Sequence, residues 1–280
     1  MTPDPDIVRE LRAAGCVFAE EEAAVLTDAA AGPPDLDALV ARRVAGEPLE
    51  QVVGHADFCG VRVRLRPGVF VPRVRSELLV RTAAAEARDG SLVVDLCCGS
   101  GALGLAVRHR VPGITLHAAD LDPAAVACAK ENLTAESRKA GDGDEGNGDE
   151  DVTGRGRAGD VHQGDLYDAL PAHLRGHIDV LLANVPYVAT AHLPFLPPEA
   201  RDHEPRAALD GGDDGLHVFR AVAAGAPEWL APAGLLLTEI TEAQAATALA
   251  IAGGNGLTAT VVTDDDLDAC AIIARPAPGR

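Results

Sequence analysis

The chain lacks several features that mark special classes of protein. Aromatic residues make up 3% of its 280 residues, and methionine and tryptophan occur once each. No apolar run approaches the roughly 20 residues that span a bilayer, and the N-terminus has no basic start of a secretory signal peptide. Because 47% of the residues are hydrophobic, the sequence predicts a globular cytoplasmic protein with a substantial core.

Cysteine and basic residues are also sparse. No CxxC spacing occurs, so we expect reduced thiols and no metal site. The formal net charge of -19 works against direct binding to nucleic acid. Part of that charge lies in residues 141–151, which have no side chain able to join a core, and a disordered acidic insertion is expected at residues 136–159. The six cysteines are Cys16, Cys59, Cys97, Cys98, Cys128 and Cys270.

The hydrophobic pattern divides the chain into three parts. Residues 1–50 contain two helix-like stretches, at 7–26 and 36–45, and predict a short helical cap. Residues 51–75 alternate between apolar and polar side chains, which predicts a linking β-hairpin. Residues 76–280 alternate between strands and helices, which predicts an α/β fold with a mostly parallel, doubly wound sheet. The expected strands are 92–96, 114–119, 178–183, 234–240, 257–262 and 270–274.

A tight glycine turn follows the first expected strand of the sheet. Gly99, Gly101 and Gly104 have the GxGxxG spacing of dinucleotide-binding turns, whereas the lysine of a Walker loop is missing. An acidic residue at the strand end, Asp95, followed by a turn of small residues instead matches the loop that binds S-adenosylmethionine. A packing turn without a ligand is the simplest alternative. The candidate cofactor-binding residues here are Asp95, Cys97, Cys98, Gly99, Ser100 and Gly101.

Acidic residues also lie at the end of the expected strand 114–119 and at a third strand end, after Val161. Asp120 could accept hydrogen bonds from both hydroxyls of a ribose, whereas Asp122, at a helix start, is more typical of an N-cap. Asp165 could accept a hydrogen bond from an adenine amino group while Leu166 packs on the base, although a cap for the helix near Asp168 fits Asp165 nearly as well. These residues predict a nucleoside cofactor without choosing between NAD and S-adenosylmethionine.

Four residues after the buried strand 178–183 carry the strongest functional signal. Asn184, Val185, Pro186 and Tyr187 would lie beyond the carboxyl end of a parallel strand, where open α/β sheets bind ligands. We interpret them as a site that holds a planar NH2 group for methylation on nitrogen. Asn and Pro are also common in turns, so a plain turn is the alternative for this tetrapeptide taken alone.

The motifs in this order resemble the HemK/PrmC family of protein-(glutamine-N5) methyltransferases. Residues 46–49 and 71–80 are similar to that family's interdomain hairpin and its PRxxTE segment. Residues 204–216, EPRAALDGGDDGL, closely resemble its EPxxALxGGxDGL signature. The resemblance implies a class I, Rossmann-like methyltransferase that uses S-adenosylmethionine. Its implied reaction is methylation of a glutamine side-chain nitrogen in a protein, such as the Gly-Gly-Gln loop of a peptide-chain release factor.

The resemblance also assigns roles to individual residues. The turn at 97–101, Asp120, Leu166 and Asn184 correspond to the cofactor-binding positions, and residues 184–187 correspond to the motif that holds the substrate glutamine. Asn184 Oδ1 and the backbone carbonyl of Val185 would each accept one hydrogen of the substrate NH2 group. Tyr187 would pack against the planar amide.

Some positions depart from the family pattern and leave other functions open. Val185 replaces the first proline of the usual NPPY but keeps its carbonyl, and Cys97 and Cys98 replace the commoner Gly-Thr. The N-terminal helical part has about half the expected length. The alternatives are an adenine-N6 or other nucleic-acid methyltransferase, which uses the same type of tetrapeptide, and a non-catalytic module that binds S-adenosylmethionine. A nicotinamide-dependent reductase would leave the motifs at 184–187 and 204–216 unexplained.

Overall fold

The N-terminal part is a small helical unit with its own core. The computed structural model describes residues 3–139 and 159–277. Leu11, Leu26 and Val40 are buried together between the first helices. The single helix predicted at 7–26 is wrong, because Gly15 has φ of +96° and ends the first helix there. The four helices are α1 (Pro5–Ala13), α2 (Ala19–Ala29), α3 (Pro33–Val44) and α4 (Leu49–Val53).

A short antiparallel hairpin follows these helices. Strands β1 (His55–Phe58) and β2 (Val61–Arg64) pair directly, and β2 alternates buried valines with exposed arginines. The two turn residues, Cys59 and Gly60, both have positive φ, as the favoured two-residue hairpin turns require. The hairpin is shorter than the predicted 51–75, since residues 51–53 belong to α4 and residues 65–71 continue as a loop.

The remainder forms one large sheet, and the predicted mostly parallel, doubly wound α/β fold is confirmed. Seven strands of the described residues lie in the order β5-β4-β3-β6-β7-β9-β8, and β9 runs antiparallel to both its neighbours. The sheet order changes direction next to β3, where open α/β folds bind their ligands. The strands are β3 (Leu92–Leu96), β4 (Thr115–Asp120), β5 (Asp160–Gln163), β6 (Ile178–Ala183), β7 (Leu230–Ile240), β8 (Leu257–Asp264) and β9 (Ala269–Pro276).

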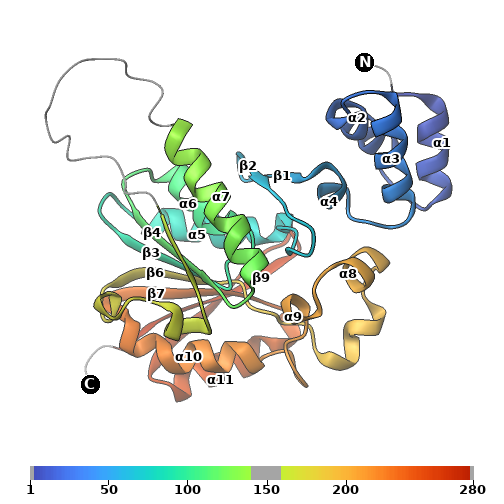
Figure 1. Ribbon diagram of the computed structural model, residues 1–280. Coiled ribbons are helices and arrows are strands. Elements are labelled where there is room, and N and C mark those ends of the chain that lie inside the picture. Colours follow the sequence, from blue (N-terminus) through green and yellow to red (C-terminus); the bar gives the residue numbers. More distant parts are fainter. Residues whose placement is uncertain (1–2, 140–158, 278–280) are drawn as a thin grey trace, which may run out of the picture.

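Helices cover the two faces of the sheet, as Figure 1 shows. Val93 joins the core beneath one group of helices and Val94 joins the core on the opposite face, because successive side chains of a strand point to opposite sides. One face carries α5 (Glu77–Glu86), α6 (Ala102–Arg110) and α7 (Pro123–Lys139), and the other carries α10 (His217–Trp229) and α11 (Ala245–Gly254).

Short helical segments fill most of the connections. Helix α7 continues to Lys139 through residues that favour helix, so the insertion predicted at 136–159 begins too early. The rest of that prediction, at 140–158, lies outside the described residues. Within the described ranges, no helix is long and apolar enough to cross a membrane. The short segments are η1 (Val74–Ser76), η2 (Leu166–Ala169), η3 (Ala172–Leu174), η4 (Thr190–Phe195), α8 (Pro198–His203), α9 (Arg206–Leu209) and η5 (Glu242–Gln244).

Candidate active site

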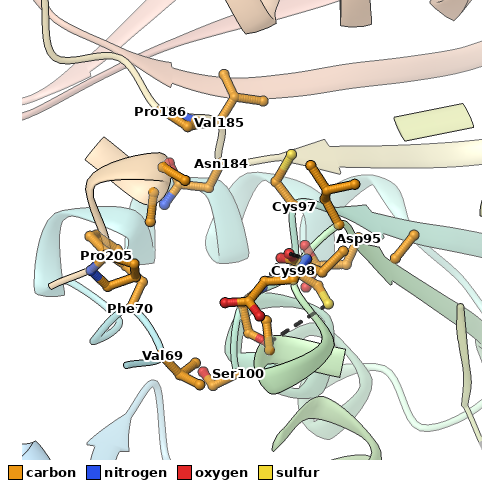
Figure 2. Close-up of a pocket in the computed structure, with 18 of the residues that line it drawn as sticks. Val69, Phe70, Asp95, Cys97, Cys98, Ser100, Asn184, Val185, Pro186 and Pro205 are labelled. Atoms are coloured by element: carbon orange, nitrogen blue, oxygen red, sulfur yellow. Dashed lines mark hydrogen bonds between the residues drawn. The ribbon is translucent and has the colours of Figure 1, made fainter. Parts of the chain in front are cut away.

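A cavity of about 380 Å³ lies at the carboxyl ends of the parallel strands (Figure 2). Its volume falls in the range of small-molecule sites. Loops that follow four neighbouring strands contribute to it, and the loop after the hairpin forms the opposite wall. Its lining residues include Val69, Phe70, Pro72, Asp95, Cys97, Cys98, Gly99, Ser100, Asp120, Asp165, Leu166, Asn184, Val185, Pro186, Tyr187 and Pro205.

The structure brings the predicted site residues together at this cavity, with the exception of Gly101. A Cβ at Gly101 would meet the Cβ of Ala129 at 3.2 Å, so this glycine lets the loop pack against helix α7. Gly104 similarly packs against strands β3 and β4, where a Cβ would meet Leu116 at 2.9 Å. A Cβ at Gly99 would meet no described atom within 4 Å. Of the three spaced glycines, Gly99 is therefore the one placed for a ligand to approach its backbone.

The first residue of the glycine loop, Cys97, has a backbone conformation that suits the glycine it replaces. Cys97 has φ of +54°, in the left-handed region that favours glycine, and this is where the family commonly has glycine. Burial raises the pKa of the Cys97 thiol to about 12 and raises the pKa of Cys98 well above its usual value. Both side chains therefore remain protonated at neutral pH and contribute apolar surface to the cavity rather than a nucleophile.

Asp120 holds the glycine loop in place at the end of β4. Its Oδ2 accepts a hydrogen bond from the Gly99 backbone N–H at 2.8 Å, and its Oδ1 accepts one from the Asp122 N–H at 2.9 Å. Asp122 caps helix α7 by accepting from Ala124 N–H at 2.8 Å, as the sequence predicts for it. A carboxylate has about four acceptor positions, so Asp120 retains acceptors for a ligand in the cavity. Burial raises the pKa of this carboxyl.

Asp95 lies in the floor of the cavity and is 1% exposed. Its Oδ2 accepts a hydrogen bond from the Gly104 N–H at 2.9 Å, which ties strand β3 to the start of helix α6. Burial raises the pKa of Asp95 to about 7, and the nearby Asp120 carboxylate adds to this effect, whereas the Gly104 N–H opposes it. The hydrogen bond to Gly104 indicates that Asp95 fixes the conformation of the glycine loop between β3 and α6.

This raised pKa predicts a pH dependence of stability. Between about pH 4 and pH 7 the folded protein holds a proton on Asp95 that the unfolded chain has lost, so the free energy of unfolding falls as pH rises. Relative to Asp95→Asn, the wild type should lose up to about 1.4 kcal/mol per pH unit in this window and stay level above it. Urea unfolding of both proteins from pH 5 to 8 measures the difference. Identical slopes would contradict it.

The loop after β5 presents Asp165 and Leu166 to the same cavity. Asp165 precedes η2, but its side chain makes no capping hydrogen bond within the described residues, so the capping alternative loses its support. Tyr167 anchors the loop by donating a hydrogen bond to the Val222 carbonyl at 2.7 Å, and its ring stacks on Trp229 with 5.5 Å between centroids. The anchored loop leaves the Asp165 carboxylate available to a ligand.

Asn184 is held by residues from distant parts of the chain. Its Nδ2 donates a hydrogen bond to Ser76 Oγ at 3.1 Å, and Tyr187 donates its hydroxyl to Glu239 Oε1 at 2.6 Å. Ser76 and Glu239 are both buried. Neither appears among the predicted site residues, although a charged residue within the apolar end of β7 was a signal that could have identified Glu239.

The wall opposite Asn184 is fixed by the first residue of the 204–216 signature. Buried Glu204 accepts hydrogen bonds from the Val71 N–H at 3.2 Å and from Arg73 Nη2 at 2.5 Å. The Arg73 guanidinium also lies 5.0 Å from the centroid of the Phe70 ring, which lines the cavity. The loop after the hairpin is thereby attached to the part of the chain that contains the large sheet.

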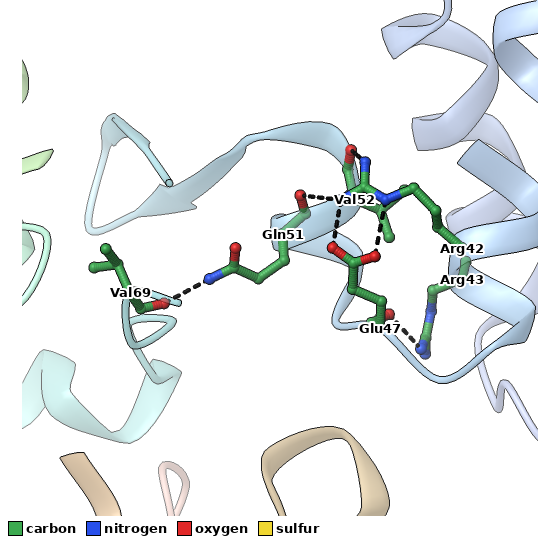
Figure 3. Close-up of polar contacts among 6 residues, drawn as sticks. All are labelled: Arg42, Arg43, Glu47, Gln51, Val52 and Val69. Atoms are coloured by element: carbon green, nitrogen blue, oxygen red, sulfur yellow. Dashed lines mark hydrogen bonds and ion pairs between the residues drawn. The ribbon is translucent and has the colours of Figure 1, made fainter. Parts of the chain in front are cut away.

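The N-terminal helices reach this wall through Gln51 (Figure 3). Gln51 Nε2 donates a hydrogen bond to the carbonyl of Val69 at 2.5 Å. Arg42 holds the backbone of the same turn by donating to the carbonyls of Gln51 and Val52, at 3.1 and 3.0 Å. Arg43 joins α3 to Glu199 of α8 at 2.6 Å. The helical unit therefore supports one side of the cavity.

The rest of the signature packs behind the 184–187 motif. The Val188 N–H donates to the Leu209 carbonyl at 3.0 Å, and the Gly211 N–H donates to the Val188 carbonyl at 2.8 Å. Gln244 Nε2 donates to the carbonyls of Tyr187 and Asp214 at 2.9 and 3.0 Å. The signature is a brace that fixes the chain immediately after Tyr187.

Known proteins resemble this chain. Residues 60–193 match the family model of the methyltransferase small domain. A release factor glutamine methyltransferase from Geobacter sulfurreducens is 34% identical over 78% of this chain and 69% of its own length. A 4-amino-L-phenylalanine/4-methylamino-L-phenylalanine methyltransferase from Streptomyces pristinaespiralis is 36% identical over 74% of this chain and 65% of its own length.

A solved structure of another protein has a similar fold. The crystal structure of a methyltransferase from Pyrococcus furiosus has a TM-score of 0.55 at 13% identity and covers 85% of this chain and 97% of its own. Sheet order, glycine loop and cavity are those of a class I methyltransferase, and the cofactor is S-adenosylmethionine. With the identity and coverage of the Geobacter relative, the chain belongs to the family of release factor glutamine methyltransferases.

Proposed function

We propose that this protein transfers a methyl group from S-adenosylmethionine to the side-chain amide nitrogen of a glutamine in a peptide-chain release factor. The observation that carries the proposal is the position of Asn184, at the end of β6 in the cavity, with its Nδ2 already engaged by Ser76. Its Oδ1 then remains as an acceptor for an NH2 group. The proposed setting is the cytoplasm, and the proposed partner is the release factor rather than a nucleic acid.

The cofactor fits the residues at the carboxyl ends of β3, β4 and β5. Asp120 would accept from the ribose hydroxyls, Asp165 would accept from the adenine amino group, and Leu166 would pack on the base. The open side of Gly99 leaves room for a ligand beside the backbone of the turn. When bound, the cofactor supplies an electrophilic methyl group on a sulfonium.

The substrate amide fits the residues that follow β6. An amide nitrogen is a poor nucleophile because its lone pair is delocalised into the carbonyl, so orientation provides most of the catalysis. Asn184 Oδ1 and the Val185 carbonyl each accept one hydrogen of the NH2 group and stabilise positive charge as it develops on nitrogen. Pro186 keeps Val185 extended, and Tyr187 packs against the amide and excludes water.

The proposal is tested by mass spectrometry after incubation with isotope-labelled S-adenosylmethionine. Purified release factor is offered beside a variant in which the glutamine of its Gly-Gly-Gln loop is alanine. One labelled methyl group on that glutamine, and none on the variant, is the expected result. Label on a different protein, on RNA, or on a small aromatic amine such as 4-amino-L-phenylalanine with the release factor unlabelled would overturn the release-factor assignment.

Asp120→Ala should weaken cofactor binding, because it removes the acceptor proposed for the ribose hydroxyls and the hydrogen bond that holds the Gly99 backbone. Loss of a charged hydrogen-bond acceptor worth about 1.5 to 3 kcal/mol corresponds to roughly a 10- to 100-fold higher Kd for S-adenosylmethionine. Isothermal titration calorimetry measures the change. The matched control is Asp4→Ala, which removes the N-cap of helix α1, outside the cavity, and costs helix stability of about 1 kcal/mol instead. Equal affinity losses in the two variants would contradict the role of Asp120.

A further inference from the structure

One buried carboxylate, that of Glu239, is connected by hydrogen bonds to both Asn184 and Tyr187. Glu239 on β7 is 3% exposed, and its two oxygens have separate partners. Oε2 accepts the hydroxyl of Ser76 at 2.6 Å, and Oε1 accepts the hydroxyl of Tyr187 at 2.6 Å. Ser76 in turn accepts from Asn184 Nδ2 at 3.1 Å. Glu239 therefore reaches Tyr187 directly and Asn184 through one hydroxyl.

The direction of each hydrogen bond between Glu239, Ser76 and Asn184 follows from the carboxylate of Glu239. An ionised carboxylate only accepts, so the single hydroxyl hydrogens of Ser76 and Tyr187 must both point at Glu239. Ser76 Oγ then has only lone pairs left for Asn184, which must donate through Nδ2. The Asn184 amide cannot rotate by 180° without setting its Oδ1 against an oxygen that has no hydrogen to offer. Its Oδ1 is thereby directed away from Ser76.

The surroundings of Glu239 keep this arrangement in place. Arg75 Nε lies 4.0 Å from Glu239 Oε1 and supplies an opposite charge at the edge of the buried group. Ser76 is fully buried and follows Arg75 at the end of η1, while Thr238, before Glu239, donates its hydroxyl to the Ala183 carbonyl at 2.5 Å. This hydrogen bond joins β6 and β7 beside Asn184, which follows β6, and Glu239, which lies near the end of β7.

We propose that Glu239 is a positioning residue that, through Ser76, holds Asn184 Oδ1 toward the substrate and so makes the site select an NH2 group over a carboxylate oxygen. This inference rests on the proposed function of Asn184 as the acceptor for the substrate amide. A glutamine NH2 group meets an acceptor in this arrangement, whereas a glutamate oxygen would meet another oxygen. Selection arises because an unmatched buried polar group costs more than a matched one gains.

Glu239→Gln tests the inference with nearly unchanged shape. Glutamine at this position can donate to Ser76, which frees the Ser76 hydroxyl to donate to Asn184 Oδ1 and permits the rotated amide. We expect kcat for glutamine methylation to fall roughly 10- to 100-fold, with Kd for S-adenosylmethionine changed less than about threefold. The preference of the protein for a glutamine peptide over the matching glutamate peptide in competition binding should narrow at least about tenfold.

Two further comparisons separate positioning from a general loss of structure. Glu242→Gln, at an exposed site in η5, is the matched control and should keep wild-type kcat. Ser76→Ala breaks the relay, meaning the two hydrogen bonds that connect Glu239 to Asn184 through Ser76, and should lower kcat as Glu239→Gln does. Ser76→Thr keeps the hydroxyl and should recover most of the activity. The double variant Ser76→Ala with Glu239→Gln should be no worse than either single variant, because both interrupt the same chain.

Specific outcomes overturn the inference. Wild-type kcat and an unchanged glutamine preference in Glu239→Gln would do so while leaving the proposed function intact. If Glu239→Gln fails to fold, equal activities of Ser76→Ala and Ser76→Thr would contradict the relay. Failure of the wild type to methylate any glutamine peptide would instead remove the proposed function on which the inference rests.

Discussion

Replacing Asn184 with alanine should lower kcat for glutamine methylation by at least about 100-fold, because the variant loses the side-chain acceptor for the substrate NH2 group. Asn184 also lines the part of the cavity assigned to the cofactor, so Kd for S-adenosylmethionine should rise, by less than about tenfold for loss of one neutral hydrogen bond. Single-turnover methylation and calorimetry measure the two quantities separately. The expected result is a large loss of chemistry beside a small loss of binding.

The matched control for Asn184→Ala is an asparagine outside the site. Asn255 donates its side-chain amide to the Ile251 carbonyl at 2.8 Å at the end of α11. Asn255→Ala should therefore cost some stability and leave kcat unchanged. If Asn184→Ala lost cofactor affinity and kcat by the same factor, Asn184 would be a support of the cofactor pocket only.

The sequence predicted the site best where a functional residue directly follows or ends a recognisable strand. Apart from Asp179, strand β6 is an apolar run, and Asn184 follows its last residue; such runs are typical of buried parallel strands. The same reasoning placed Asp95 and Asp120 at strand ends, and the structure brings both to one cavity with Asn184. These predictions succeed because the carboxyl ends of parallel strands meet at one edge of the sheet.

Other parts of the site depend on contacts between distant residues, which a local pattern cannot show. Ser76 and Glu239 are 163 positions apart, yet their side chains share a hydrogen bond. Gly101 has the spacing of a ligand-binding glycine, but its environment is set by Ala129 on helix α7. Gly15 is different, because its positive φ and the hydrogen bond from the Cys16 N–H to the Leu11 carbonyl at 3.0 Å end the first helix through local contacts.

The 204–216 signature illustrates how a family motif can be recognised before its role is understood. Its resemblance to the family pattern indicated glutamine methylation without giving any reason for its residues. The structure supplies separate reasons: Glu204 fixes the loop beside Phe70, and the glycines allow two backbones to approach each other closely. The motif acts on the cavity mainly through the backbone on either side of it.

Gly215→Ala is expected to have the second large effect. Gly215 has φ of +75°, and a Cβ there would lie less than 3.0 Å from the Tyr187 carbonyl oxygen and from Gln244 Nε2. The Tyr187 backbone must move, which separates it from Gln244 and shifts the Val185 carbonyl. We expect at least a tenfold loss of kcat and roughly 2 kcal/mol or more of stability, from strain and a broken hydrogen bond.

The matched control for Gly215→Ala is Gly253→Ala in helix α11. A Cβ at Gly253 meets no described atom within 4 Å, so alanine should stabilise the helix by roughly 0.5 to 1 kcal/mol and leave kcat unchanged. Thermal unfolding and kcat at a temperature where both variants remain folded separate strain from lost chemistry. If Gly215→Ala kept wild-type kcat, the brace behind Tyr187 would not control the position of the substrate acceptors. A lower kcat with the Kd for S-adenosylmethionine unchanged would show that the brace acts on the substrate side of the cavity.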